Sequence, residues 1–192
     1  MSDARVPKAT GLQARAAVWM ATRQFGPEAA DMAAVYSQHP TLLRWFALYD
    51  RAVSKPRRVP ERLRKLAELK AATVVGCEAC IDIGSSLARA AGLSDGQVLA
   101  LHDPEPSGLF DADELLIIAY ARAMSLTPPE VTDAQVAALR ARFGDAGLFE
   151  LTYIIAWENG RARLNTALDI PPGGFSAGQA CARAADSALA AR

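Results

Sequence analysis

The stretch that decides the fold of this chain is Arg62-Leu-Arg-Lys-Leu-Ala-Glu-Leu-Lys-Ala-Ala-Thr-Val-Val-Gly-Cys-Glu-Ala-Cys-Ile-Asp-Ile-Gly84. It predicts a helix over 61–75, which begins after Pro60, and a second helix over 81–91. Two cysteines, Cys77 and Cys80, lie between these helices, at or near the N-terminus of the second. Because residues three apart share one helix face, we expect both sulfur atoms to point the same way.

Two thiols at this spacing can close a small disulfide ring and pass two electrons. A helix N-terminus favours the thiolate, because the helix dipole and the free N–H groups stabilise negative charge. The pair therefore predicts thiol redox chemistry that requires no metal and no organic cofactor.

Three other interpretations of the cysteine pair are open to test. A structural zinc site needs two further ligands, and Cys181, His39 and His102 do not stand at ligand spacing. Covalent haem needs a histidine directly after the second cysteine, where this chain has isoleucine. Two buried, unreactive thiols are the remaining alternative, because free cysteine is often buried.

Composition describes an ordinary globular domain. The 192 residues suit one domain with an extra arm, and 51% hydrophobic residues can bury a sizeable core. The formal net charge is zero, so composition gives no argument for a nucleic-acid or membrane partner. No apolar run approaches the length of a membrane span, and the first residues lack a signal-peptide core. Three cysteines argue against a secreted disulfide framework, so we expect a cytoplasmic protein.

The pattern is helical almost everywhere and predicts an all-α protein. Capping boxes mark four helix starts, at Ser94, Asp111, Thr132 and Ser176. Further helices are expected over 12–25, after Gly26-Pro27 and over 148–168, while Pro128-Pro129 ends the helix begun at 111. The predicted organisation is a disordered N-terminus (1–10), N-terminal helices (11–39), a main domain (40–175) and an alanine-rich, weakly packed helical tail (176–192), in which Cys181 is incidental.

The segment 62–84, together with Glu158-Asn-Gly-Arg-Ala-Arg-Leu-Asn165, resembles the carboxymuconolactone decarboxylase superfamily. The resemblance is strongest to its alkyl hydroperoxidase D-like branch and covers residues 40–175. It implies an all-helical fold that assembles as a homo-oligomer, a trimer or a hexamer. In that branch the second cysteine attacks a peroxide, the first cysteine resolves the product, and a glutamate–histidine pair relays the proton.

Carried over to this chain, the resemblance makes Cys80 the attacking thiol and Cys77 the resolving one. The relay does not carry over, because its glutamate position is Lys65 and its histidine position is Gly84. Lys65 can favour the thiolate by its charge, and Glu68, on the same helix face, can supply the missing carboxylate. The alternative is a solvated ion pair between Lys65 and Glu68.

Other polar residues are weaker candidates for a substrate pocket. Asp82 lies about 200° around the helix from Cys80, which suits a structural hydrogen bond better than a base. Glu158, Arg161 and Asn165 continue an apolar stripe, so they line a pocket beside Cys80, form a subunit-interface network or make a surface ion pair.

Two further groups of residues are expected to have no catalytic or binding role. We expect Tyr153 and Trp157 to fill the core. We expect the basic stretch 51–70 to be a solvated face and not a nucleic-acid site, because it lacks interleaved aromatic residues.

The sequence favours a thiol-dependent oxidoreductase that cycles through a Cys77–Cys80 disulfide. Its expected partners are a hydroperoxide or a partner disulfide, an external thiol reductant and further copies of the chain. The alternatives are a lyase acting on a small carboxylated ring, and a non-catalytic oligomer that keeps the fold and the thiols.

Overall fold

The computed structural model describes residues 4–55 and 58–182, and within these ranges the chain is all-helical, without a strand. This confirms the all-α prediction. The helices are α1 (Leu12–Phe25), the 3₁₀ turn η1 (Pro27–Ala29), α2 (Ala30–Tyr36), α3 (Pro40–Val53), α4 (Glu61–Val75), α5 (Glu78–Ala90), α6 (Asp95–Ala100), α7 (Pro104–Ser107), α8 (Ala112–Ser125) and α9 (Asp133–Ala167).

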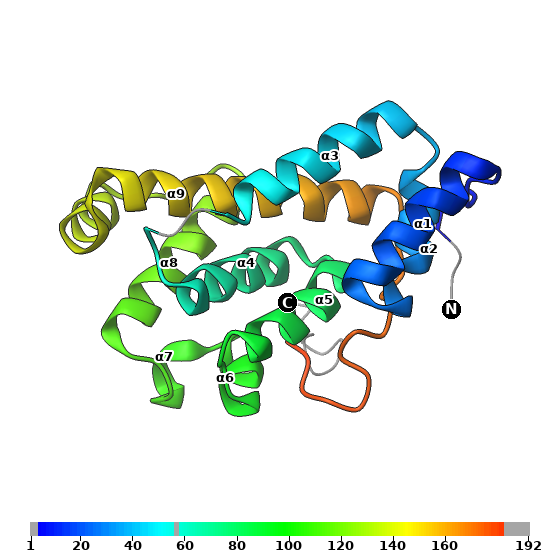
Figure 1. Cartoon of the computed structure of the whole chain (residues 1–192). Helices are drawn as coiled ribbons and strands as arrows, with labels where there is room; N and C mark the ends of the chain where they lie inside the picture. Colours follow the sequence, from blue (N-terminus) through cyan, green and yellow to red (C-terminus); the bar gives the residue numbers. More distant parts are fainter. Residues whose placement is uncertain (1–3, 56–57, 183–192) are drawn as a thin grey trace.

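Helix α4 is the centre of the fold, because it packs against α5, α8 and α9 (Figure 1). Its residues Leu66 and Leu69 are fully buried. The helix ends at Gly76, whose φ of 77° is a left-handed conformation that favours glycine. The chain therefore turns directly into α5, with Cys77 in the N-cap position of that helix.

Local signals placed most helix boundaries correctly. Ser94, Asp111 and Thr132 each form both hydrogen bonds of a capping box. Helix α4 has the predicted ends, and α5 begins three residues before the predicted start. The helix expected over 148–168 is the last part of α9, whose backbone is interrupted at Gly144 with a φ of 69°.

The fourth capping box is wrong, because residues 176–182 form turns and not a helix. Asp82 binds the backbone of this segment: its Oδ1 accepts the Ser176 N–H at 2.8 Å, and its carbonyl accepts the Ser176 hydroxyl at 2.7 Å. Ala182 is fully buried and donates its N–H to Ser85 Oγ at 3.0 Å. This part of the tail is therefore packed on α5, and residues 183–192 lie outside the described ranges.

Residues 4–10, for which we expected disorder, are tied to the helical body. The N–H of Arg5 donates to the Leu168 carbonyl at 2.8 Å, and that of Ala9 donates to the Ala34 carbonyl at 3.0 Å. The expectation is corrected for this segment, because backbone groups of two distant elements bind it, while residues 1–3 lie outside the described ranges.

The basic stretch 51–70 is only partly a solvated face. Arg64 and Lys70 are buried in α4. The Lys70 ammonium donates to the Leu101 carbonyl at 2.8 Å, and Arg64 Nε lies 3.8 Å from Glu150 Oε1. Since both cations find acceptors inside the fold, the solvated-face interpretation is wrong for them; Pro56 and Arg57 are not described.

The two aromatic residues assigned to the core lie nearer the surface. Tyr153 is 42% exposed, with its ring 5.6 Å from that of Phe149, so the assignment is wrong for Tyr153. Trp157 is half-buried and donates its indole N–H to Asp50 at 2.9 Å. None of the described helices is both long and apolar enough to cross a membrane.

Candidate functional site

The thiols of Cys77 and Cys80 face each other at the start of α5, with their Sγ atoms 2.7 Å apart. Cys77 Sγ also accepts the backbone N–H of Cys80 at 3.2 Å, as an N-cap side chain does. Both residues are buried, at 2% and 3% exposure. The predicted position at a helix N-terminus and the shared direction of the sulfurs are thus both present.

The pKa values of the two thiols are shifted in opposite directions. The hydrogen bond between the two sulfurs is the largest influence that lowers the pKa of Cys77, and the backbone N–H of Cys80 lowers it further. The same sulfur–sulfur bond raises the pKa of Cys80, and burial and the Glu158 carboxylate raise it more. The backbone N–H that Cys77 accepts at the start of α5 favours a thiolate at that position.

Asn165 of α9 holds the second cysteine in place. Its Nδ2 donates to Cys80 Sγ at 3.3 Å, and its Oδ1 accepts the hydroxyl of Tyr36. Burial is the main cause that raises the pKa of Tyr36, so this hydroxyl stays protonated as the donor. Tyr36 was not among the sequence candidates, because a lone tyrosine at the end of the short helix α2 carries no local signal.

Glu158 supplies a buried carboxylate beside Cys80. Its Oε2 accepts Arg161 Nε at 3.0 Å, whereas its Oε1 is buried and has no hydrogen-bond partner among the described residues. Burial raises the pKa of Glu158, while Arg161 and the nearby Cys80 thiol lower it. Arg161 also pairs with Asp50 at 3.0 Å. A carboxyl group with a raised pKa beside a thiol is a candidate proton acceptor.

Lys65 and Glu68 form an ion pair at 2.8 Å. Their side chains are 17% and 15% exposed, so the pair is neither solvated nor deeply buried. Glu68 acts on the Glu158–Arg161 pair through its charge, whereas the charges that act on the thiols are those of Glu158 and Arg161. Of the two carboxylates, Glu158 is therefore the one whose charge raises the pKa of both thiols.

The remaining candidates serve the fold. Asp82 accepts the backbone N–H groups of residues 174, 175 and 176, as expected of a structural hydrogen-bonder, and it does not join Glu158 and Asn165. His39 caps α3, and His102 contacts the Ala182 carbonyl at 2.8 Å. Cys181 lies 3.7 Å from Ser85 Oγ. In the part of the chain that the structure describes, no three His, Cys, Asp or Glu residues are grouped to hold a metal ion.

Gly84, at the histidine position of the relay, packs directly against α4. A Cβ atom there would lie 3.2 Å from Leu69 Cδ1. This contact leaves little room for an imidazole, because Leu69 is fully buried.

Comparison with known proteins shows what this chain is similar to. Residues 40–106 match the Carboxymuconolactone decarboxylase family, which confirms the resemblance found in the sequence. The "Uncharacterized protein YnjA" of Escherichia coli (strain K12) is 42% identical over 114 residues, which cover 59% of this chain. The matched part spans 62% of the length of that relative.

Solved structures share the architecture. The apo structure of the debrominase Bmp8 superposes with a TM-score of 0.70 at 18% identity, covering 83% of this chain and 86% of that one. A variant of Bmp8 with one cysteine replaced by alanine, in complex with 2,3,4-tribromopyrrole, superposes with a TM-score of 0.69, also at 18% identity, covering 84% and 88%. At this identity the likeness establishes the fold.

Proposed function

We propose that this protein is a thiol-dependent oxidoreductase of the alkyl hydroperoxidase D type, which reduces an oxidant through Cys77 and Cys80. The observation that carries the proposal is the 2.7 Å approach of the two sulfurs at a helix N-terminus. The buried, unpaired oxygen of Glu158 next to Cys80 adds a proton acceptor to the pair.

The geometry favours Cys77 as the attacking thiolate, the reverse of the roles that the resemblance implies. Cys77 Sγ accepts the backbone N–H of Cys80 at the start of α5, and the pKa of Cys77 is lowered, whereas that of Cys80 is raised. In the first step the Cys77 thiolate attacks a hydroperoxide, the O–O bond breaks, and a sulfenic acid forms. The alkoxide leaves and takes a proton from solvent.

In the second step Cys80 passes its proton to Glu158 and attacks the Cys77 sulfur. The S–S bond forms, and hydroxide leaves with the proton returned by Glu158, as water. The two sulfurs have then supplied two electrons, and an external dithiol reduces the disulfide. Asn165 acts as a positioning residue, since its hydrogen bond holds the sulfur of Cys80.

The burial of both thiols is what unreactive cysteines would also show. Their surroundings differ from an inert core, however, because an amide, a carboxylate and an N–H group act on the sulfurs. The fold shared with a debrominase adds a brominated pyrrole to the oxidants worth testing. In the reduction of a brominated pyrrole, the two thiols would again supply the electrons. A C–H bond would replace the C–Br bond, and bromide would leave.

The test is thiol counting and mass spectrometry of the folded protein after mild peroxide treatment. We expect two thiols to disappear, with a mass loss of about 2 Da for one disulfide, and dithiothreitol to restore both. Turnover is then measured with hydroperoxides and with 2,3,4-tribromopyrrole. Cys181→Ser is the matched control, because this thiol lies against Ser85, outside the pair.

Two variants assign the roles of the cysteines. Cys80→Ser should still consume one equivalent of peroxide and accumulate a sulfenic acid on Cys77. Cys77→Ser should lose this reaction. Full activity in Cys77→Ser would return the attacking role to Cys80, and activity in the double variant would favour a lyase or another thiol-independent reaction.

A further inference from the structure

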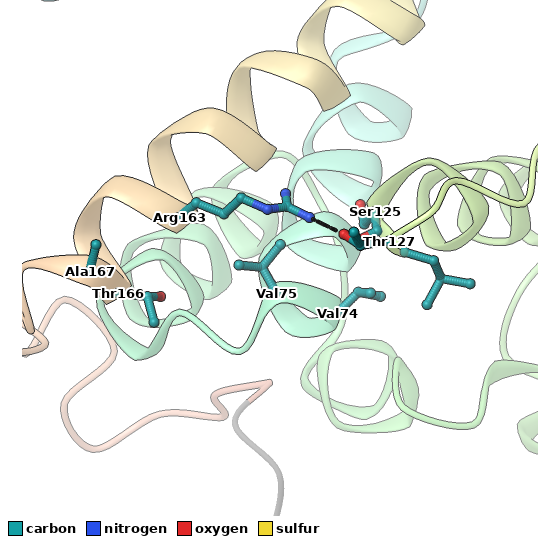
Figure 2. Close-up of a pocket in the computed structure, with 8 residues that line it drawn as sticks. Val74, Val75, Ser125, Thr127, Arg163, Thr166 and Ala167 are labelled. Atoms are coloured by element: carbon teal, nitrogen blue, oxygen red, sulfur yellow. Dashed lines mark hydrogen bonds between the residues drawn. The ribbon is translucent and has the colours of Figure 1, made fainter.

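A pocket of about 500 Å³ opens where the end of α4, the segment after α8 and the last turns of α9 meet (Figure 2). Valines 74 and 75 provide part of its apolar wall. Thr127, Arg163 and Thr166 provide polar groups, and Figure 2 shows the Arg163 side chain reaching toward Thr127. The pocket thus combines an apolar surface with a cation and several hydroxyl groups.

Arg163 has only neutral partners among the described residues. Its Nη1 donates to Asn159 Oδ1 at 2.8 Å, and its Nη2 donates to Thr127 Oγ1 at 3.1 Å. Arg161, two residues earlier, has carboxylate partners on both sides, and Arg142 pairs with Asp113. The positive charge of Arg163 is therefore available to an anion, and a guanidinium fork fits a carboxylate well.

The same pocket adjoins the cysteine pair. Val75 is separated from Cys77 only by the exposed, left-handed Gly76. Thr166 follows Asn165, which donates to Cys80, and a hydrogen bond from the Thr166 side chain lowers the pKa of Cys77. The pocket lining therefore includes residues within two positions of Cys77 and next to Asn165, which binds Cys80.

We propose that this pocket binds the carboxylate of an organic acid and that the oxidant of the cysteine pair is a carboxylate-bearing organic hydroperoxide. Arg163 and Thr127 hold the carboxylate, and the valines cover the apolar part of the molecule. The inference rests on the proposed function for its redox step. In that step Cys77 takes the distal oxygen of the hydroperoxide, and the hydroxy acid leaves. Cys80 then closes the disulfide with release of water.

Binding is tested apart from chemistry, with decanoate as the probe and calorimetry on the reduced, full-length protein. Arg163→Met keeps the aliphatic stem and removes the charge, and we expect it to weaken decanoate binding about tenfold or more. Arg163→Lys keeps the charge and should recover part of the affinity. Arg142→Met is the matched control, since this exposed arginine pairs with Asp113 elsewhere on the surface.

Turnover is then compared for linoleic acid hydroperoxide and for the uncharged cumene hydroperoxide, with dithiothreitol as the reductant for both. Arg163→Met should raise the KM for the acid about tenfold and leave its kcat and the values for cumene hydroperoxide unchanged. Equal losses for both oxidants, or equal decanoate affinity in wild type and Arg163→Met, would overturn the inference. Arginine-dependent decanoate binding without turnover of any hydroperoxide would support the carboxylate site and refute the proposed function.

Discussion

Replacing Glu158 by glutamine tests the electrostatics of the site most directly. The substitution keeps the shape of the side chain and removes a charge that raises the pKa of both thiols. Arg161 keeps its ion pair with Asp50 at 3.0 Å, so the surrounding structure should persist. The variant therefore separates the charge of Glu158 from its packing.

The size of the effect follows from the neighbours of Glu158. Two unit charges about 5 Å apart interact by ~3 kcal/mol at an effective dielectric constant of ~20. Arg161 neutralises much of the charge of this carboxylate through Oε2, so we expect about half of this energy, ~1.5 kcal/mol, to act on the thiolate. Because the thiolate exists above its pKa and removing the charge lowers that pKa, the midpoint of alkylation by iodoacetamide should fall by about one pH unit in the variant.

The same variant should slow the closing of the disulfide, because Cys80 loses its proton acceptor. We expect a loss of about 10²-fold, measured by quenched-flow alkylation after one equivalent of peroxide. Glu68→Gln is the control, since Glu68 pairs with Lys65 at 2.8 Å and its charge acts on Glu158 and Arg161. An unchanged pH midpoint and closing rate in Glu158→Gln, with a slowed rate in Glu68→Gln, would refute this reasoning.

Three further outcomes are expected. Asp82→Ala removes the acceptor of three backbone N–H groups, and each of these hydrogen bonds contributes about 1.5–3 kcal/mol. Limited proteolysis near Ser176 should therefore accelerate at least about tenfold. Unchanged cleavage would contradict the role of Asp82. Gly84→His should lower the free energy of unfolding by about 1–3 kcal/mol, because its Cβ would lie 3.2 Å from Leu69 Cδ1. The same variant should not raise turnover. Gly84→Ala, with a smaller side chain, is the control in the same thermal unfolding series. The family resemblance predicts a homo-oligomer, so light scattering should give a multiple of 20.4 kDa, and a monomer mass would contradict the prediction. Trp45→Glu tests whether the exposed face of α3 contributes to the subunit contact, because the Trp45 side chain is 59% exposed.

Several features of the fold are local and could be predicted from the sequence. The capping boxes at Ser94, Asp111 and Thr132 depend on groups three residues apart, so their hydrogen bonds form wherever the helix does. The capping pattern at Ser176 failed for the opposite reason. A buried carboxylate, Asp82, 94 residues earlier in the chain, binds that backbone in a different conformation.

The cysteine pair was also visible in the sequence, because its spacing and its place before α5 are set by adjacent residues. The surroundings of each thiol were decided by the tertiary structure. Cys80 is bound by Asn165, which is 85 residues away, and lies beside the Glu158 carboxylate on the same distant helix. A pKa depends on every charge and dipole within a few ångströms, whatever its position in the chain, so the packing of α9 against α5 sets the surroundings of the two sulfurs.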